Sequence, residues 1–393
     1  MSHTTAELSQ QAGDPVPSLA GMATAPVVRA PPGRVGMGPA GWARQNLFGS
    51  IPSSVLTVIL IVLLAYWAFQ FVNWALIHPV WSVPVNGERA DTSACRNVQG
   101  IGACWAVITE NYRLILFGRY PYEEQWRPAI VVLLFIGLYA VSAMRRFWRK
   151  ELLLIWIATL TVIGVLMWGG VFGMAFVRQD NWGGLPITLI LATFGLAFAF
   201  PLAVLVALGR RSTALPAVKV LCVVYVELIR GVPLITLLFM ASVMFPLFMP
   251  PNLNPDKLLR AQVAIILFAA AYLAEVVRGG LQALPKGQYE AADALGLSYW
   301  KKTGLIILPQ ALRLVIPPLV NTFIGFFKDT SLVLIIGIFD LLLSAQVVLG
   351  NDVWRPYNTE IYLVLGAIYF VFCYVMARYS RGLERELSRS VRR

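Results

Sequence analysis

The chain has 393 residues, of which 58% are hydrophobic and only 13% are charged. Soluble domains carry roughly 25% charged residues, so much of this chain's surface faces something other than water. The net charge is +12. The basic residues cluster at the ends of apolar runs and in the C-terminal tail, which argues against nucleic-acid binding and is typical of orientation in a membrane.

The N-terminal segment 1–50 is predicted to be disordered and cytoplasmic, because residues 1–46 are rich in Pro, Gly, Ala and Ser. The first apolar run begins near Ile51 and is too long for the apolar region of a cleavable signal peptide.

Eight apolar runs are candidates for membrane spans, each of which needs about 20 apolar residues. In chain order they are Ile51–Ile77, Ala129–Met144, Leu152–Val177, Trp182–Gly209, Val220–Pro246, Ala261–Leu284, Leu312–Leu341 and Ile361–Ala377. The pattern predicts an all-α integral membrane protein with about eight transmembrane helices.

Every second connection between these runs is strongly basic, which indicates that it is cytoplasmic. The basic residues in these connections and in the tail include Arg145, Arg146, Arg149, Lys150, Arg210, Arg211, Lys219, Lys286, Lys301, Lys302, Arg378, Arg381 and Arg385. Both termini are therefore predicted to be cytoplasmic, and residues 78–127 are predicted to form an external loop. We find no internal repeat of the kind from which secondary carriers are often built.

Cys95 and Cys104 lie in that external loop. A disulfide between them is possible if the loop is in an oxidising compartment, but their spacing does not demand one. Cys222 and Cys373 lie inside apolar runs, where a packing role is expected. His3 and His78 are isolated, which argues against a histidine metal site.

The connection between the sixth and seventh runs is the most informative stretch. Residues Glu290 to Leu295 favour a helix, Gly296 allows a sharp turn, and a second short helix is expected up to Pro309. On the cytoplasmic face, such a connection fits either a plug for a partner's groove or an ordinary interfacial amphipathic connector.

The spacing of this stretch resembles the EAA loop of ABC importer permeases. The matching residues are Glu290, Ala291, Ala292, Gly296, Ile306, Leu308 and Pro309. The resemblance implies that this loop, within residues 285–311, forms the coupling helix that docks on a nucleotide-binding subunit.

Three further stretches are similar to the polar amino-acid permeases, the family of the histidine, glutamine and glutamate importers. They are residues 225–234, 271–280 and 327–332. The resemblance covers residues 182–378, which implies a type I-like permease core in the last five helices. Residues 51–181 would then hold three accessory helices, as in the enlarged permeases of general L-amino-acid importers, and 379–393 a basic cytoplasmic tail.

Charged residues inside the runs are costly in a bilayer and usually face a cavity or a partner. Glu227 and Arg230 are three residues apart on one helical face, and Glu275 and Arg278 repeat that spacing. Each pair is either an internal ion pair or part of a polar lining for a zwitterion, which needs both donors and acceptors. A substrate path is predicted to include Glu227, Arg230, Lys328, Asp329, Thr330 and Ser331.

The Gly231–Pro233 turn breaks regular helical hydrogen bonding, either as a structural kink or as irregular backbone that lines a cavity. No P-loop, nucleophile elbow or zinc-protease signature is present in the sequence. If ATP drives this protein, it is hydrolysed by another subunit, and no cofactor is expected in this chain.

The resemblance implies a permease subunit in the bacterial inner membrane that imports polar L-amino acids and is not itself an enzyme. Its partners would be a second permease, two ATP-binding subunits that use ATP and Mg, and a periplasmic amino-acid-binding protein. Two alternatives remain at this point: an ion-coupled secondary amino-acid carrier, and a membrane-embedded enzyme or assembly factor.

Overall fold

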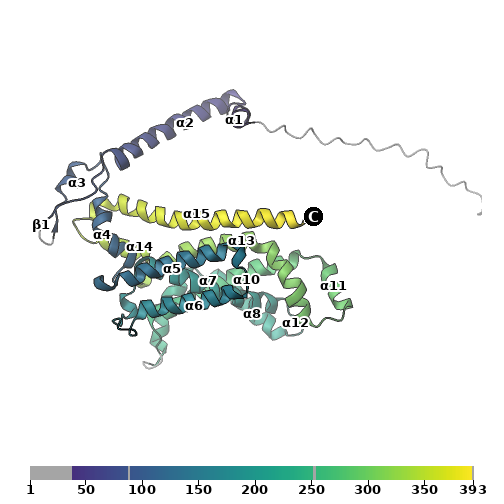
Figure 1. Ribbon diagram of the computed structural model, residues 1–393. Helices are drawn as coiled ribbons and strands as arrows, with labels where there is room; N and C mark the ends of the chain where they lie inside the picture. Colours follow the sequence, from purple (N-terminus) through teal and green to yellow (C-terminus); the bar gives the residue numbers. More distant parts are fainter. Residues whose placement is uncertain (1–37, 87–88, 251–253, 392–393) are drawn as a thin grey trace, which may run out of the picture. The chain divides into compact units, whose positions relative to one another are not determined.

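Helices form nearly all of the regular structure in the computed structural model, which describes residues 38–86, 89–250 and 254–391 (Figure 1). The chain divides into two units, Met1–Val72 and Asn73–Arg393. The all-helical prediction is confirmed apart from one antiparallel hairpin of two-residue strands, β1 (Val85–Asn86) and β2 (Arg89–Ala90), in which Val85 pairs with Ala90.

The first unit contains helices α1 (Pro39–Leu47) and α2 (Ile51–Val72). The expectation of disorder is wrong for Pro39–Leu47, where a proline at the first helical position suits helix initiation; residues 1–37 lie outside the described part. The Ser53 and Thr57 hydroxyls both donate to the Leu47 carbonyl and set the turn between the helices. Charge-free α2 has 22 residues, enough for the roughly 30 Å hydrocarbon core.

Seven helices of the described residues are long and apolar enough to span a membrane, or eight if one bent pair counts as a span. The second unit continues from α2 through the π-helical turn η2 (Asn73–Ile77). Its long helices are α5 (Trp126–Ala143), α6 (Lys150–Trp168), α7 (Gly184–Arg210), α10 (Lys257–Ala283), α13 (Leu308–Asp329) and α15 (Asn358–Val391).

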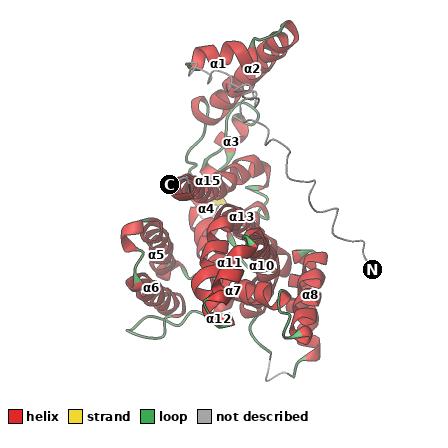
Figure 2. Cartoon of the chain, turned by 90° about the vertical axis from the view of Figure 1, so that its right-hand side faces the viewer, coloured by secondary structure: helices red, strands yellow, loops and turns green. Residues whose placement is uncertain are grey.

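Helices α7 and α10 pack against each other at the centre of the second unit. Ala199, Ala203 and Ala207 are fully buried and recur every four residues, so they form one face of α7. Small residues let membrane helices approach closely, and a Cβ on Gly195 of α7 would lie 3.0 Å from the Ile265 side chain of α10. Figure 2 shows α5 and α6 on one side of this centre and α8 (Pro216–Gly231) on the other.

Two of the predicted spans end differently from the sequence prediction. The run Leu152–Val177 overshoots, because the helix stops at Trp168 where Gly169, Gly170 and Gly173 all take positive φ. The run Val220–Pro246 is not one straight helix: α8 and the segment Leu234–Phe248, which begins with α9 (Leu234–Phe239), are bent by 103° at Val232–Pro233.

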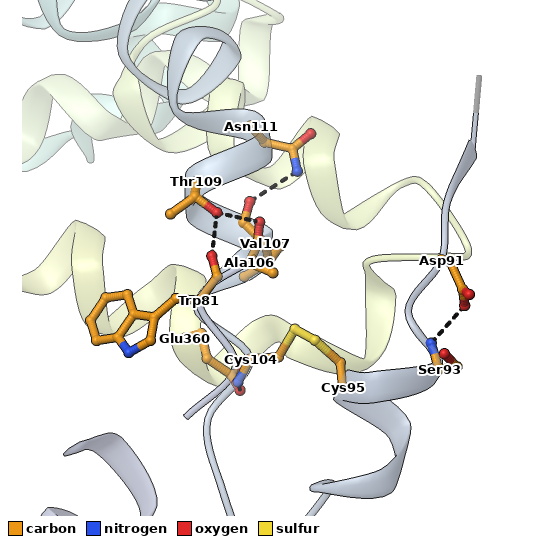
Figure 3. Close-up of a disulfide and its surroundings, with 10 residues drawn as sticks. All are labelled: Trp81, Asp91, Ser93, Cys95, Cys104, Ala106, Val107, Thr109, Asn111 and Glu360. Carbon is orange, nitrogen blue, oxygen red and sulfur yellow. Dashed lines mark hydrogen bonds between the residues drawn. A yellow bond between two sulfur atoms is a disulfide. The ribbon is translucent and has the colours of Figure 1, made fainter. Parts of the chain in front are cut away.

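The predicted external loop is an ordered segment with helices α3 (Ser93–Asn97) and α4 (Ala106–Phe117). Cys95 and Cys104 form a disulfide, and both are buried (Figure 3). The Cys104 amide donates to the Glu360 carboxylate of α15 at 3.0 Å. At the start of α3 the Ser93 amide donates to Asp91, and this hydrogen bond lowers the pKa of the Asp91 carboxyl.

The end of α4 crosses the start of α7 with backbone against backbone. A Cβ on Gly183 would lie 2.8 Å from the Gly118 Cα, and one on Gly184 would lie 2.1 Å from the Leu116 carbonyl oxygen. The Gly184 amide donates to the Phe339 carbonyl at 2.8 Å. Asp340, the residue after Phe339, is buried and caps helix α14 (Leu341–Leu349). The crossing of α4 with α7 joins the accessory segment, residues 51–181, directly to the core.

Candidate functional site

The predicted coupling loop is a helix, a glycine turn and a second helix. Helix α11 (Lys286–Ala294) ends before Gly296, whose φ of 68° is left-handed, and the Leu297 amide donates back to the Ala292 carbonyl at 3.2 Å. A Cβ at residue 296 would meet nothing within 4 Å. The glycine is therefore required for its backbone conformation, as at the end of many helices, rather than for space.

The second helix does not stop at Pro309 as predicted. It begins with α12 (Tyr299–Lys301) and continues through a π-helical stretch (Lys302–Ile307) into α13 as one 38-residue span, Tyr299–Ile336. Pro309 lies at the first positions of α13, and its missing N–H falls where the helical bonding changes from the π to the α pattern. The prediction of a short second helix is therefore wrong.

The motif residues divide between the interior and the surface. Ala292 is buried, and Ile306 and Leu308 pack against the core, whereas Glu290, Ala291 and Pro309 are exposed. Around them the loop exposes large apolar side chains, with Leu295 at 75% and Trp300 at 71% exposure. Exposed apolar side chains at this end of a membrane protein would be covered by a protein partner or by the membrane interface. Figure 2 shows α11 and α12 at the end of the bundle that faces the viewer.

Two polar contacts join the arms of the loop. The Lys302 ammonium pairs with the Asp293 carboxylate, and the Gln310 amide donates to the Gln288 side chain at 3.1 Å. These bonds hold α11 against the start of the 299–336 helix.

Arg210, at the end of α7, links the two predicted acidic positions. Its guanidinium lies 3.0 Å from a Glu227 oxygen of α8 and 2.5 Å from a Glu275 oxygen of α10. Glu275 also pairs with Arg278, as the ion-pair interpretation of that spacing expected. Glu227 pairs with Arg210 and not with Arg230, whose guanidinium lies 5.4 Å from the Tyr272 ring centroid.

Sequence reasoning missed Arg210 as a site residue, because a basic residue at the end of a span was explained by membrane orientation alone. Local spacing offered no signal for it, because Glu227 and Glu275 each have an arginine three residues on in the same helix, Arg230 and Arg278.

The second predicted polar stretch lies where α13 passes into the 3₁₀ segment η10 (Thr330–Ile336). Lys328 is exposed and Asp329 is half-buried, so adjacent charges face different surroundings. The Thr330 and Ser331 hydroxyls donate to the carbonyls of Phe327 and Lys328. Helix α9, which follows the 103° bend, packs on η10, whereas Glu227 and Arg230 lie on α8, before the bend.

Comparisons with known proteins agree with this architecture. The family described as "Binding-protein-dependent transport system inner membrane component" matches residues 199–389. The chain is 48% identical over 353 residues to the inner membrane amino-acid ABC transporter permease protein YhdY of Escherichia coli, covering 88% of this chain and 92% of the relative. The chain belongs to the binding-protein-dependent ABC transporter permeases.

A second relative is the glutamate/glutamine/aspartate/asparagine transport system permease protein BztC of Rhodobacter capsulatus, 38% identical over 89% of this chain and 94% of its own length. The crystal structure of an amino acid ABC transporter with histidines matches at 30% identity with a TM-score of 0.46, covering 52% of this chain and 92% of that one. The alignment with the Escherichia coli relative is 353 residues long, whereas the family match covers only residues 199–389. The relative therefore also shares much of the accessory segment, residues 51–181, of this permease.

Membership in this family makes the chain an inner-membrane transport component and not an enzyme, and it implies ATP-binding and substrate-binding partners. The alternative of an ion-coupled secondary carrier finds no support among these relatives. Among the described residues there is no cluster of three or more His, Cys, Asp or Glu suited to a metal ion.

Proposed function

We propose that this permease translocates polar L-amino acids across the inner membrane, together with a second and different permease subunit, two ATP-binding subunits and a periplasmic amino-acid-binding protein. The amino-acid transporters among its relatives support the substrate class. The observation that carries the proposal is the α11–Gly296–α12 loop, which offers exposed apolar side chains for docking. ATP with Mg would be used by the partner subunits and not by this chain.

The continuity of the 299–336 helix supports a mechanical route from the docking loop to the path. A force applied by the ATPase at Trp300 acts on the same helix that carries Lys328 and Asp329. ATP binding would then shift the population between outward and inward access, because the ATPase subunits bind the two states with different affinity.

Two polar groups are proposed to line the path for the zwitterion. Glu227 and Arg230 lie at the end of α8, and Lys328, Asp329, Thr330 and Ser331 lie at the junction of α13 and η10. Carboxylates suit the substrate ammonium, and guanidinium and ammonium groups suit its carboxylate. Packing of α9 on η10 supports a single path through both groups.

The proposed topology has both termini in the cytoplasm and residues 78–127 outside. The basic connections support this orientation, and the Cys95–Cys104 disulfide fits an oxidising compartment.

The test compares two glycines of one loop. Gly296→Val should distort the turn, because a β-branched residue is strained at a φ of 68°, and should reduce both ATPase co-purification and amino-acid uptake at least about tenfold. Gly287→Val is the matched control, because Gly287 also lies in open space but has no positive φ.

Normal assembly and uptake with Gly296→Val would contradict the docking role. Competition of uptake by a panel of amino acids, in the reconstituted complex, gives the substrate range. Uptake by the chain alone under an ion gradient would contradict the ATP-driven mechanism.

A further inference from the structure

One buried carbonyl joins the coupling helix to the ends of two core helices. Leu281 lies in the last turn of α10, where carbonyl groups have no partner within the helix. Its carbonyl oxygen accepts hydrogen bonds from Arg211, which follows α7, at 2.7 Å and from the Tyr289 hydroxyl of α11 at 2.8 Å.

Arg211 and Tyr289 also contact each other. The Arg211 guanidinium donates to the Tyr289 hydroxyl at 2.8 Å and lies 5.2 Å from the centroid of its ring. Three groups from α7, α10 and α11 thus meet in one triangle of hydrogen bonds. Hydrogen bonds made by a charged donor are stronger than neutral ones, which favours a fixed geometry.

The covalent link between α10 and α11 is short and does not by itself fix their angle. It consists of Leu284, with an extended backbone, and Pro285. A cavity of about 390 Å³ adjoins the triangle and is lined in part by Arg211, Tyr289 and Glu290. The open space on that side leaves side-chain contacts, rather than dense packing, to fix the tilt of α11.

Arg211 is the neighbour of Arg210 in the chain. Arg210 holds Glu227 of α8 and Glu275 of α10, while Arg211 holds the coupling helix. Two adjacent arginines therefore connect α11 on one side to α8 on the other, and α8 leads through the 103° bend to α9 at the proposed path.

We propose that Arg211 and Tyr289 are positioning residues that make α11 and the ends of α7 and α10 move as one body, so that motion of the docking loop reaches Arg210 and α8. The proposal rests on the proposed function, since it assigns how that docking loop transmits its movement. It places a second route beside the 299–336 helix.

The test uses the whole transporter in proteoliposomes, with uptake and ATP hydrolysis measured together. Tyr289→Phe keeps the aromatic ring and removes the hydroxyl that makes both hydrogen bonds. The variant should still assemble with the ATPase subunits, but amino acid transported per ATP hydrolysed should fall about five- to tenfold. Arg211→Lys should act in the same direction, because an ammonium cannot stack on the Tyr289 ring as the planar guanidinium does.

The double variant decides whether the two residues act as a unit. Tyr289→Phe with Arg211→Lys should lose no more than the stronger single variant, because both remove the same triangle. The matched control is Tyr374→Phe: the Tyr374 ring stacks on Phe370, and its hydroxyl makes no hydrogen bond within the described residues. This control should transport like the wild type.

A normal ratio of transport to ATP hydrolysis in Tyr289→Phe, or additive losses in the double variant, would overturn the proposal. Loss of ATPase association in Tyr289→Phe would also overturn it, because Tyr289 would then act in docking. Failure of the wild-type complex to assemble or to import amino acids would instead contradict the proposed function.

Discussion

The two ends of the helix bundle in the second unit are held by different kinds of contact. At the proposed external end the contacts are a disulfide, a crossing of backbones at Gly118 and Gly183, and a buried arginine, Arg127, with no exposed surface. At the proposed cytoplasmic end they are ion pairs and hydrogen bonds of partly exposed side chains, with Glu227 at 62% exposure.

The contrast indicates which end of the bundle is able to rearrange. Covalent bonds and backbone crossings have no alternative partners, whereas partly exposed ion pairs are individually weak and exchange readily with water or with each other. Movement driven by ATP is therefore expected to enter where Arg210 and Arg211 make their contacts, against an external end that stays fixed.

The largest effect is expected at Arg127. Its guanidinium pairs with Glu124 at 2.8 Å and donates to the Ala175 carbonyl at 2.9 Å. Arg127→Met leaves both the Ala175 carbonyl and the Glu124 carboxylate, which is 26% exposed, without their partner. The two losses together should cost about 3–5 kcal/mol. The measurement is thermal unfolding of the purified complex in detergent.

The Arg178–Asp180 pair, at the proposed external end, is the control for that variant. Its two side chains are 76% and 68% exposed, and Arg178→Met should cost only about 0–1 kcal/mol. Equal losses from the two arginine variants would show that burial of Arg127 does not make the external end the more rigid one.

A smaller effect is expected from the disulfide. Cys95 and Cys104 are nine residues apart, and replacing both by serine should lower stability by about 2–3 kcal/mol. Thermal unfolding with and without a reductant measures the loss. The wild type should lose stability with reductant and the double-serine variant should not; a reductant effect that persists in the variant would place the sensitive group elsewhere.

The smallest effect on stability, but a large one on transport, is expected from Arg210→Lys. A single ammonium does not bridge Glu227 and Glu275 as a guanidinium fork does, but it keeps the positive charge beside both carboxylates. The contact that it gives up most easily is the one with Glu227, which is 62% exposed and contributes only about 0–1 kcal/mol. The rate of amino-acid uptake should fall several-fold, while the midpoint temperature of thermal unfolding should change little.

Arg355→Lys, in an exposed pair with Asp352, is the control for Arg210 and should change neither quantity. A stability loss at Arg210 comparable to that of Arg127→Met would remove the contrast between the two ends.

Sequence reasoning predicted the spans well where apolar length alone decides. Ile51–Ile77 appears with the same bounds, and the Gly231–Pro233 break coincides with the 103° bend between α8 and α9. The end of α6 was misjudged, because Gly169–Val177 is as apolar as a span and only its backbone angles turn it into a loop. A hydropathy profile contains no information on the backbone angle φ.

The site was predicted in its motif but not in its connections. Glu227 and Glu275 were recognised as costly, yet their common partner Arg210 lies 17 and 65 residues away in the chain. Local spacing favoured the partner three residues away, Arg230, which instead lies over Tyr272. Only the crossing of α7, α8 and α10 decides which cation meets which carboxylate.

The hydrogen bond from Cys104 to Glu360 has a consequence for how the protein is made. These residues are 256 positions apart, so at about 5–20 residues per second Glu360 is synthesised roughly 13–50 s after Cys104. During that interval the cysteine pair is available for oxidation, while its acceptor on α15 does not yet exist. The segment that carries the disulfide therefore gains this contact only when the last helix has been made, and a chain truncated before α15 would leave the Cys104 amide without its acceptor.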